Sequence, residues 1–188
     1  MIEELRPGLK RWTVPHPEWK PEEDELDESY RQVASLVYRA PDALVFVDPL
    51  VPEELWPLLD AEVEAAAQPV VVLTTIHWHA RSRDAVVERY DGELDRLPAG
   101  VRSFPAERQQ EQVLWLEEPR ALVFGDAVLG DQRGGLRVCP WFKFEVERAR
   151  TVDALRPLLQ LPVELVLPAH GNVVLEGGQA ALARALDA

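Results

Sequence analysis

The 188-residue chain has only one cysteine, Cys139, so it cannot form an internal disulfide. A nucleophilic thiol needs a basic neighbour, whereas Cys139 is flanked by Val138 and Pro140, and we do not expect it to be catalytic. No hydrophobic run approaches the length of a membrane-spanning helix. The first residues also lack the apolar core of a secretion signal. These absences predict a cytoplasmic protein.

Positive charge is scarce as well. The 20 lysines and arginines are outnumbered by 33 aspartates and glutamates, which gives a formal net charge of −13. Binding to nucleic acid or to an anionic membrane needs a basic surface, so we expect neither partner. The contents of 47% hydrophobic and 28% charged residues are typical of a globular domain. The length fits one domain over residues 1–188 with a sizeable core.

The hydrophobic pattern predicts an α/β fold. Strands are expected at 9–14, 30–40, 43–47, 70–76, 101–104, 112–116, 121–124 and 163–167. Helices are expected from Pro52 or Pro57 to about residue 68, over 84–97 with an interruption at Asp91-Gly92, after Thr151 as N-cap, and after Gly177-Gly178. The strand–helix–strand order over 43–76 predicts a parallel pair with a right-handed crossover. Such alternation favours a layered α/β architecture.

The most informative segment is the β-branched run 70–76, which leads into His77, Trp78 and His79. A run of this kind predicts a strand that is buried on both faces. Side chains alternate along a strand, so we expect both imidazoles on one side and Trp78 on the other. Two such imidazoles can bind one metal ion, although the pattern alone is equally typical of polar loop residues.

Three other apolar runs end in polar residues of the same kind. Residues 43–47 lead into Asp48, 121–124 lead into Gly125-Asp126, and 164–167 lead to His170. If these strands end at one edge of a sheet, their tips converge where open sheets bind ligands. Three of the four histidines lie at these strand ends. The fourth, His16, lies between two prolines and is expected in a loop, with a place at the mouth of the site as the alternative.

These motifs together resemble the metallo-β-lactamase superfamily of metal-dependent hydrolases. Its signature is an HxHxDH run after a buried strand, a later Gly-Asp, and a late histidine before glycine. The matching positions are His77-Trp78-His79, Gly125-Asp126 and His170-Gly171, in the same order and with similar spacing over roughly 35–188. The resemblance implies a four-layer αββα sandwich with the site at the sheet edge between the layers.

The chain departs from this signature at two places. Arg81-Ser82 stands where the family has Asp-His, and Glu107 stands closest to a further family histidine. The resemblance therefore implies that the second metal site is degenerate. Arg81 is expected to repel a second ion. It would pair with Asp126, bind an anionic substrate group, or point to solvent.

The ligands implied by the resemblance are His77, His79 and Asp126, with Glu107 as a further candidate. His170 would be a fourth ligand, a general acid or a substrate contact, so Asp126 and His170 are the predicted catalytic residues. Two histidines and a carboxylate suit one divalent ion, with zinc foremost and iron or manganese as alternatives.

The implied activity is hydrolysis of a small-molecule ester, amide, thioester or phosphate. The alternative is a non-catalytic relative that serves as a binding or structural module, because function depends on the site and not on the fold. The aromatic run 141–144 would pack in the core or a lid, line a pocket, or form a homodimer contact.

Overall fold

The computed structural model describes residues 2–20, 31–131 and 134–188. The sequence also predicts an acidic loop over 20–29 and a flexible loop over 130–135, of which residues 21–29 and 132–133 lie outside the described residues. The strands are β1 (Glu3–Arg6), β2 (Leu9–Pro15), β3 (Gln32–Arg39), β4 (Leu44–Val47), β5 (Val70–Leu73), β6 (Glu93–Leu94), β7 (Val101–Pro105), β8 (Gln112–Leu116), β9 (Ala121–Phe124), β10 (Val128–Gly130), β11 (Leu136–Val138) and β12 (Leu165–Pro168). The helices are α1 (Trp56–Ala66), α2 (Arg83–Tyr90), α3 (Glu145–Leu155) and α4 (Gly178–Leu186), with short 3-10 turns η3 (Glu53–Leu55), η4 (His77–His79) and η5 (Arg156–Gln160). Among the described helices, none has the length and apolar character needed to cross a bilayer.

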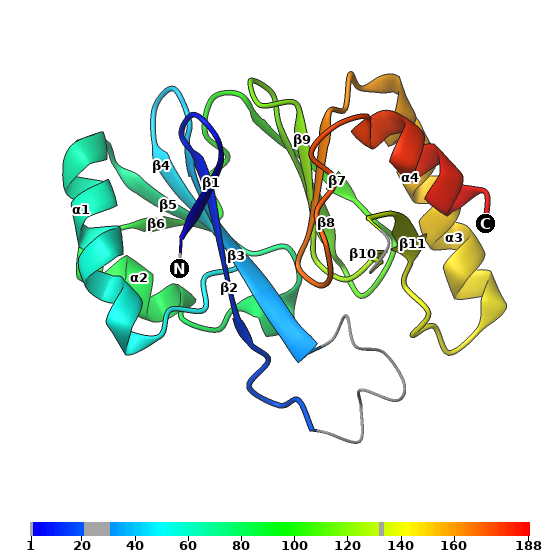
Figure 1. The fold of residues 1–188 in the computed structure, drawn as a ribbon, viewed down its shortest axis with the longest axis horizontal. Helices are drawn as coiled ribbons and strands as arrows, with labels where there is room; N and C mark the ends of the chain where they lie inside the picture. Colours follow the sequence, from blue (N-terminus) through cyan, green and yellow to red (C-terminus); the bar gives the residue numbers. More distant parts are fainter. Residues whose placement is uncertain (1, 21–30, 132–133) are drawn as a thin grey trace.

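Two mixed sheets form the centre of the molecule (Figure 1). One has six strands in the order β1-β2-β3-β4-β5-β6, and the other has four in the order β12-β9-β8-β7. Strands β4 and β5 run parallel, as the strand–helix–strand pattern predicts, and β9 and β12 are parallel too. The short hairpin β10-β11 forms a separate two-stranded sheet.

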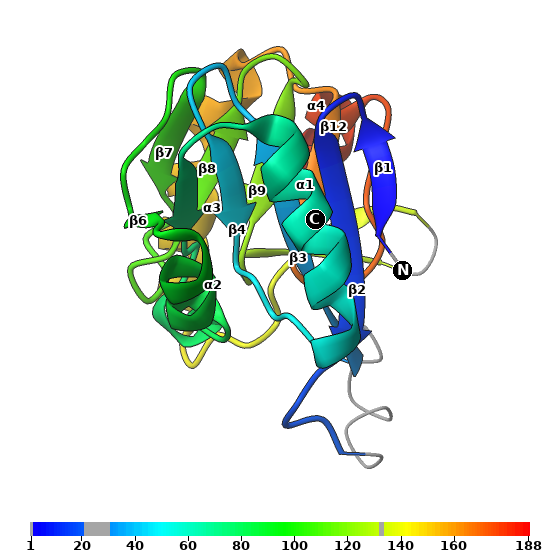
Figure 2. The same cartoon turned by 90° about the vertical axis from the view of Figure 1, so that its left-hand side faces the viewer.

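Alternating side chains build three apolar layers. Val45 and Val47 of β4 point between the two sheets, whereas Leu44 and Phe46 point to the helices α1 and α2. The second sheet follows the same rule, with its outer face packed against α3 and α4. Helices therefore cover the outer face of each sheet (Figures 1 and 2). This is the predicted four-layer αββα order, and the burial on both faces explains the continuous apolar runs.

Several boundaries differ from the sequence-based expectations. Thr151 is not an N-cap: α3 begins six residues earlier, at Glu145, and Thr151 is buried inside it. The carboxylate of Glu147 accepts the backbone N–H groups of Lys143 and Phe144, which satisfies donors at the true start of the helix. The helix predicted over 84–97 ends at Tyr90, and β6 follows it.

The carboxyl ends of four strands meet at one edge, as predicted. The Asp48 N–H donates to the carbonyl of Leu73, which joins the tips of β4 and β5. The Ala169 N–H donates to Phe124, which joins the tips of β12 and β9. The Ala34 N–H donates to the Ala169 carbonyl at 2.8 Å and links the two sheets here. The polar residues after these strands are thereby brought together.

Candidate metal centre

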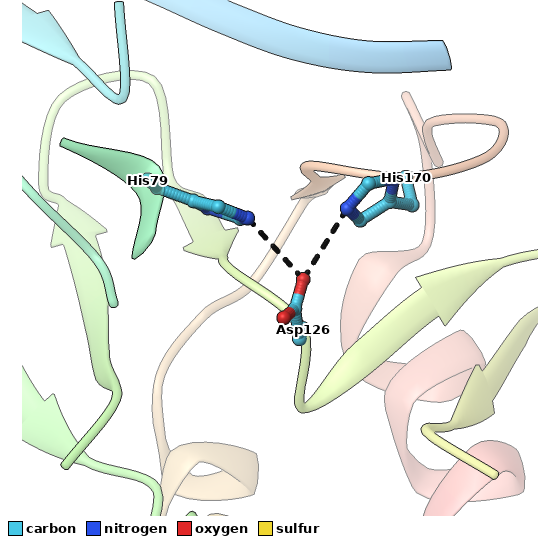
Figure 3. Close-up of side chains that lie close together, drawn as sticks. All are labelled: His79, Asp126 and His170. Atoms are coloured by element: carbon cyan, nitrogen blue, oxygen red, sulfur yellow. Dashed lines mark ion pairs between the residues drawn. The ribbon is translucent and has the colours of Figure 1, made fainter. Parts of the chain in front are cut away.

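Three side chains from distant parts of the sequence converge at this edge (Figure 3). His79 ends the turn η4, Asp126 follows β9, and His170 follows β12. One ligand atom from each lies within 4.8 Å of the others, and the residues are only 2%, 4% and 1% exposed. This buried group could hold one metal ion.

The carboxylate of Asp126 lies between the two imidazoles. Its Oδ1 is 3.4 Å from Nε2 of His79 and 3.3 Å from Nε2 of His170. Within the described part of the chain, this buried Oδ1 has no hydrogen-bond partner. Burial would raise the pKa of Asp126, but the interactions with His170 and His79 hold that pKa far below its ordinary value. An ionised oxygen therefore faces two ring nitrogens at distances too long for good hydrogen bonds.

Both imidazoles are held through their other nitrogen. Nδ1 of His79 donates to Oδ2 of Asp48 at 2.9 Å, and Nδ1 of His170 donates to the carbonyl of Gln32 at 3.1 Å. A carboxylate and a carbonyl accept only, so each Nδ1 carries a proton. In the neutral ring, Nε2 then offers a lone pair toward Asp126. Metal-bound histidines in proteins are oriented by contacts of this kind.

Asp48 is the residue that fixes His79, and sequence reasoning gave it no role beyond its position at a strand end. Its backbone is left-handed, with φ of 48°. Its Oδ1 accepts the Thr75 N–H at 2.8 Å, and its Oδ2 accepts the Thr75 hydroxyl. Burial lowers the pKa of His79, but Asp48 and Asp126 raise it to about 9. In the absence of metal, His79 is therefore protonated at neutral pH.

His77 is not part of this group, because the expected strand does not reach it. β5 ends at Leu73, and residues 77–79 form a 3-10 turn. Residues two apart in such a turn differ by about 240° in direction, so His77 and His79 do not share a side. His77 is exposed and lines a pocket of about 380 Å³ together with Thr74 and Arg83.

The loop that carries Glu107 approaches the centre with different residues. Glu107 is exposed and lies outside the cluster, whereas Arg108 and Glu111 are buried. Oε1 of Glu111 accepts the backbone N–H groups of Asp126 and Ala127, both at 3.0 Å. Burial raises the pKa of Glu111 to about 7. Glu111 thus holds the turn that presents Asp126, a role that sequence reasoning missed because no motif marks it.

Gly125 is required by the tight packing of this turn. A Cβ at this position would lie 2.7 Å from the hydroxyl of Thr75 and 3.2 Å from the carboxyl of Glu111. A side chain there would displace the Thr75 hydroxyl, which is hydrogen-bonded to Asp48. Close packing therefore explains the glycine of the Gly-Asp motif, and the aspartate that follows belongs to the cluster that could hold a metal ion.

Arg81 and Ser82 make hydrogen bonds to the backbone around the site. Arg81 donates to the carbonyls of Ala34 and Asp48, both at 3.2 Å. The Ser82 hydroxyl accepts the Val51 N–H at 3.0 Å. The arginine that forms an ion pair with Asp126 is Arg108, with 3.5 Å between Nη1 and Oδ2.

His16 and two tryptophans surround the centre. The His16 ring lies 5.9 Å from that of His170, which agrees with the alternative that placed it at the mouth. Burial, then the charges of His170 and Arg81, lower the pKa of His16 to about 4. Trp141 packs edge-on against His170 at 6.2 Å and is 40% exposed.

Trp78 and Cys139 complete these surroundings. The indole N–H of Trp78 donates to Oδ2 of Asp126 at 2.8 Å. Cys139 is fully buried, and burial raises the pKa of its thiol, which favours the unreactive protonated form.

The sequence matches no protein-family model and no curated protein. Solved structures do match. The metallo-β-lactamase from Erythrobacter litoralis has a TM-score of 0.62 and 14% identity, over 99% of this chain and 90% of that one. The DIM-1 metallo-β-lactamase has a TM-score of 0.58 and 13% identity, over 100% and 95%. A metallo-β-lactamase family protein from Thermus thermophilus has a TM-score of 0.55 and 14% identity, over 98% and 78%.

The chain has the metallo-β-lactamase fold. The fold expected from the three sequence motifs is confirmed across nearly the whole chain. At these identities the likeness concerns the fold alone. What the metallo-β-lactamase fold does in this protein has to be argued from the residues at its strand ends.

Proposed function

We propose that the protein is a metal-dependent hydrolase of a small molecule, with one divalent ion bound by His79, Asp126 and His170. The observation that carries this proposal is the buried Oδ1 of Asp126. It has no hydrogen-bond partner among the described residues, and it faces two imidazoles that are held through Nδ1. A buried carboxylate oxygen without a hydrogen bond is costly, and a cation between these three groups would satisfy it.

The donor set supports a mononuclear centre. Two imidazole nitrogens and one carboxylate suit zinc, our first choice, or iron, with manganese as a further candidate. Three protein ligands leave coordination positions open for water or substrate. His77 and Glu107 lie outside the cluster, so we leave them out of the proposed ligand set.

The surrounding residues would orient these ligands and receive the substrate. Asp48 and the Gln32 carbonyl keep protons on the two Nδ1 atoms, so Nε2 is the nitrogen that each ring would offer to an ion, which would displace the second proton of His79. Trp78 holds the second oxygen of Asp126. A bound divalent ion would supply a nucleophile from water at neutral pH and polarise the oxygen under attack. His16 lies beside His170, where it can contact a substrate.

A non-catalytic role is the alternative, and one observation favours it. Protonated His79 and ionised Asp126 form a charge-balanced pair without any metal. In that case the cluster would only stabilise the fold. Metal content of the protein purified without added metal or chelator separates the two possibilities.

The test of activity is a substrate panel. Thioesters, lactones, phosphodiesters and β-lactams are assayed with zinc, manganese or iron, using wild type, Asp126→Asn and the control Asp95→Asn, which alters the outer pocket. We expect slow or narrow hydrolysis without efficient β-lactam cleavage, lost with a chelator and in Asp126→Asn but kept in the control. Metal-loaded protein that hydrolyses no member of the panel would contradict the proposal, as would turnover that survives Asp126→Asn.

A further inference from the structure

Arg108 is a buried cation placed between two buried carboxylates. It is 9% exposed, and its Nη1 lies 3.5 Å from Oδ2 of Asp126 and 3.7 Å from Oε2 of Glu111. Its guanidinium carbon lies 5.7 Å from the ring centroid of Trp78 and 5.8 Å from that of Phe142. Both rings lie within cation–π distance of the guanidinium, which favours the charge there.

Across the described residues, one atom of Arg108 and one atom of Glu111 are buried without a hydrogen bond. They are Nη1 of Arg108 and Oε2 of Glu111. These two atoms face each other at 3.7 Å, and Nη1 of Arg108 also faces Oδ2 of Asp126 at 3.5 Å, so the guanidinium charge is balanced chiefly by the ionised Asp126. Without Arg108, the carboxylates of Asp126 and Glu111 would both face the space that it vacates.

The two oxygens of Asp126 therefore face two different sets of nitrogen atoms. Oδ1 faces the imidazoles of the candidate metal centre, and Oδ2 faces Arg108. We propose that Arg108 is a built-in cation that takes the place of a second metal ion at Asp126 and limits the centre to one ion. This inference rests on the proposed function, because it concerns the number of ions at the proposed centre.

The geometry assigns this role to Arg108, because Arg108 pairs directly with Asp126, whereas Arg81 donates to the carbonyls of Ala34 and Asp48. Arginine stays charged at every physiological pH, so it excludes a second cation permanently. The repulsion between two cations grows in a buried site of low dielectric constant. A second ion would also need Oδ2 of Asp126 and Oε2 of Glu111, both of which face Arg108.

The experiment is a count of zinc ions per chain in wild type, Arg108→His, Arg108→Gln and Arg102→His. Arg108→His removes the cation and adds an imidazole beside Glu111 and Asp126, which completes a three-ligand set. Arg102→His is the control, because Arg102 also stacks on an aromatic ring, that of Phe104, but is exposed. Each protein is loaded with zinc alone, desalted and analysed by mass spectrometry of the metal, and circular dichroism checks the fold.

We expect one ion per chain in wild type and in Arg102→His, and two in Arg108→His. Arg108→Gln should gain a second, weaker binding event in a zinc titration, and this variant decides the question if Arg108→His does not fold. Two ions in wild type would overturn the inference, and so would a folded Arg108→His that still binds one ion or a folded Arg108→Gln that shows no second binding event in the titration. No zinc in any of the four proteins would refute the proposed function itself, whereas one ion in all four would refute only the role of Arg108.

Discussion

Two sides of one short turn, residues 74–79, differ sharply. On the inner side, His79 is buried, its Nδ1 donates to Asp48, and its Nε2 faces Asp126. On the outer side, His77 is exposed, packs edge-on against Trp78 with ring centroids 4.5 Å apart, and lines a pocket with Arg83. The two histidines are equivalent in the motif and unlike in the structure. The difference teaches that an oriented second contact, and not the presence of an imidazole, makes a candidate ligand.

The largest effect is expected for Asp126→Asn, which removes the negative charge that faces both His79 and His170. The amide cannot balance a cation between His79 and His170, so zinc affinity should fall by more than about 100-fold. Competition with a chromophoric chelator measures this. Asp95→Asn, in the pocket beside His77, should leave the affinity unchanged. Equal losses of zinc affinity in both variants would show that the buried side and the outer side of the turn do not differ in metal binding.

A smaller loss is expected for Asp48→Asn. The amide can still accept from Thr75, but it loses the charge that orients His79. Removal of such an outer contact typically weakens metal binding by about 10- to 100-fold. Exposed Asp42, which pairs with Arg96, provides the control Asp42→Asn. The same chelator competition applies, and unchanged affinity in Asp48→Asn would mean that His79 is positioned by other contacts.

Zinc affinity should depend on pH through His79 and not through His77. Without metal, the pKa of His79 is raised to about 9, so an ion that binds at pH 7 must displace its proton. We expect about one proton released per ion, and an affinity that falls about tenfold per pH unit below 9. Calorimetry in buffers of different ionisation enthalpy measures the release, which His77→Ala should not change. Binding without proton release would show that His79 is already neutral in the metal-free protein.

Stability of the metal-free protein should depend on the same proton. The raised pKa of His79 means that its ion pairs contribute fully below its ordinary pKa of 6.5. That contribution is lost as the pH rises through about 9. Thermal unfolding of the metal-free protein should therefore occur at lower temperature at pH 9.5 than at pH 6.5. His79→Ala should reduce this difference in unfolding temperature. An equally large difference in His79→Ala would show that another titrating group causes it.

Most of the fold followed from local patterns. The apolar runs around Val45, Val71 and Val123 predicted buried strands, and their polar ends predicted one shared edge. Asp126 and His170 were predicted as site residues because each lies within three residues of the end of such a strand. Here the local signal suffices, since strand periodicity and parallel pairing fix where a strand tip points.

The rest depended on contacts between residues far apart in sequence. His77 was expected beside His79 because the sequence predicted a strand up to residue 76. In the structure β5 ends at Leu73, and the Thr75 N–H donates to the side chain of Asp48, 27 residues away, and not to a neighbouring strand. In the loop after β7, Glu107, Gln109 and Gln110 are left-handed, with φ of 52°, 47° and 62°. Non-glycine residues rarely adopt that conformation, so the burial of Arg108 in place of Glu107 was not predictable from sequence.

The decisive measurement is the zinc content of wild type, His79→Ala and His77→Ala, each loaded under identical conditions and desalted. We expect one ion per chain in wild type and in His77→Ala, and none in His79→Ala, with all three folded by circular dichroism. Loss of zinc in His77→Ala together with retention in His79→Ala would reverse the assignment of the two histidines. Equal zinc content in all three proteins would show that the buried cluster is not the metal centre.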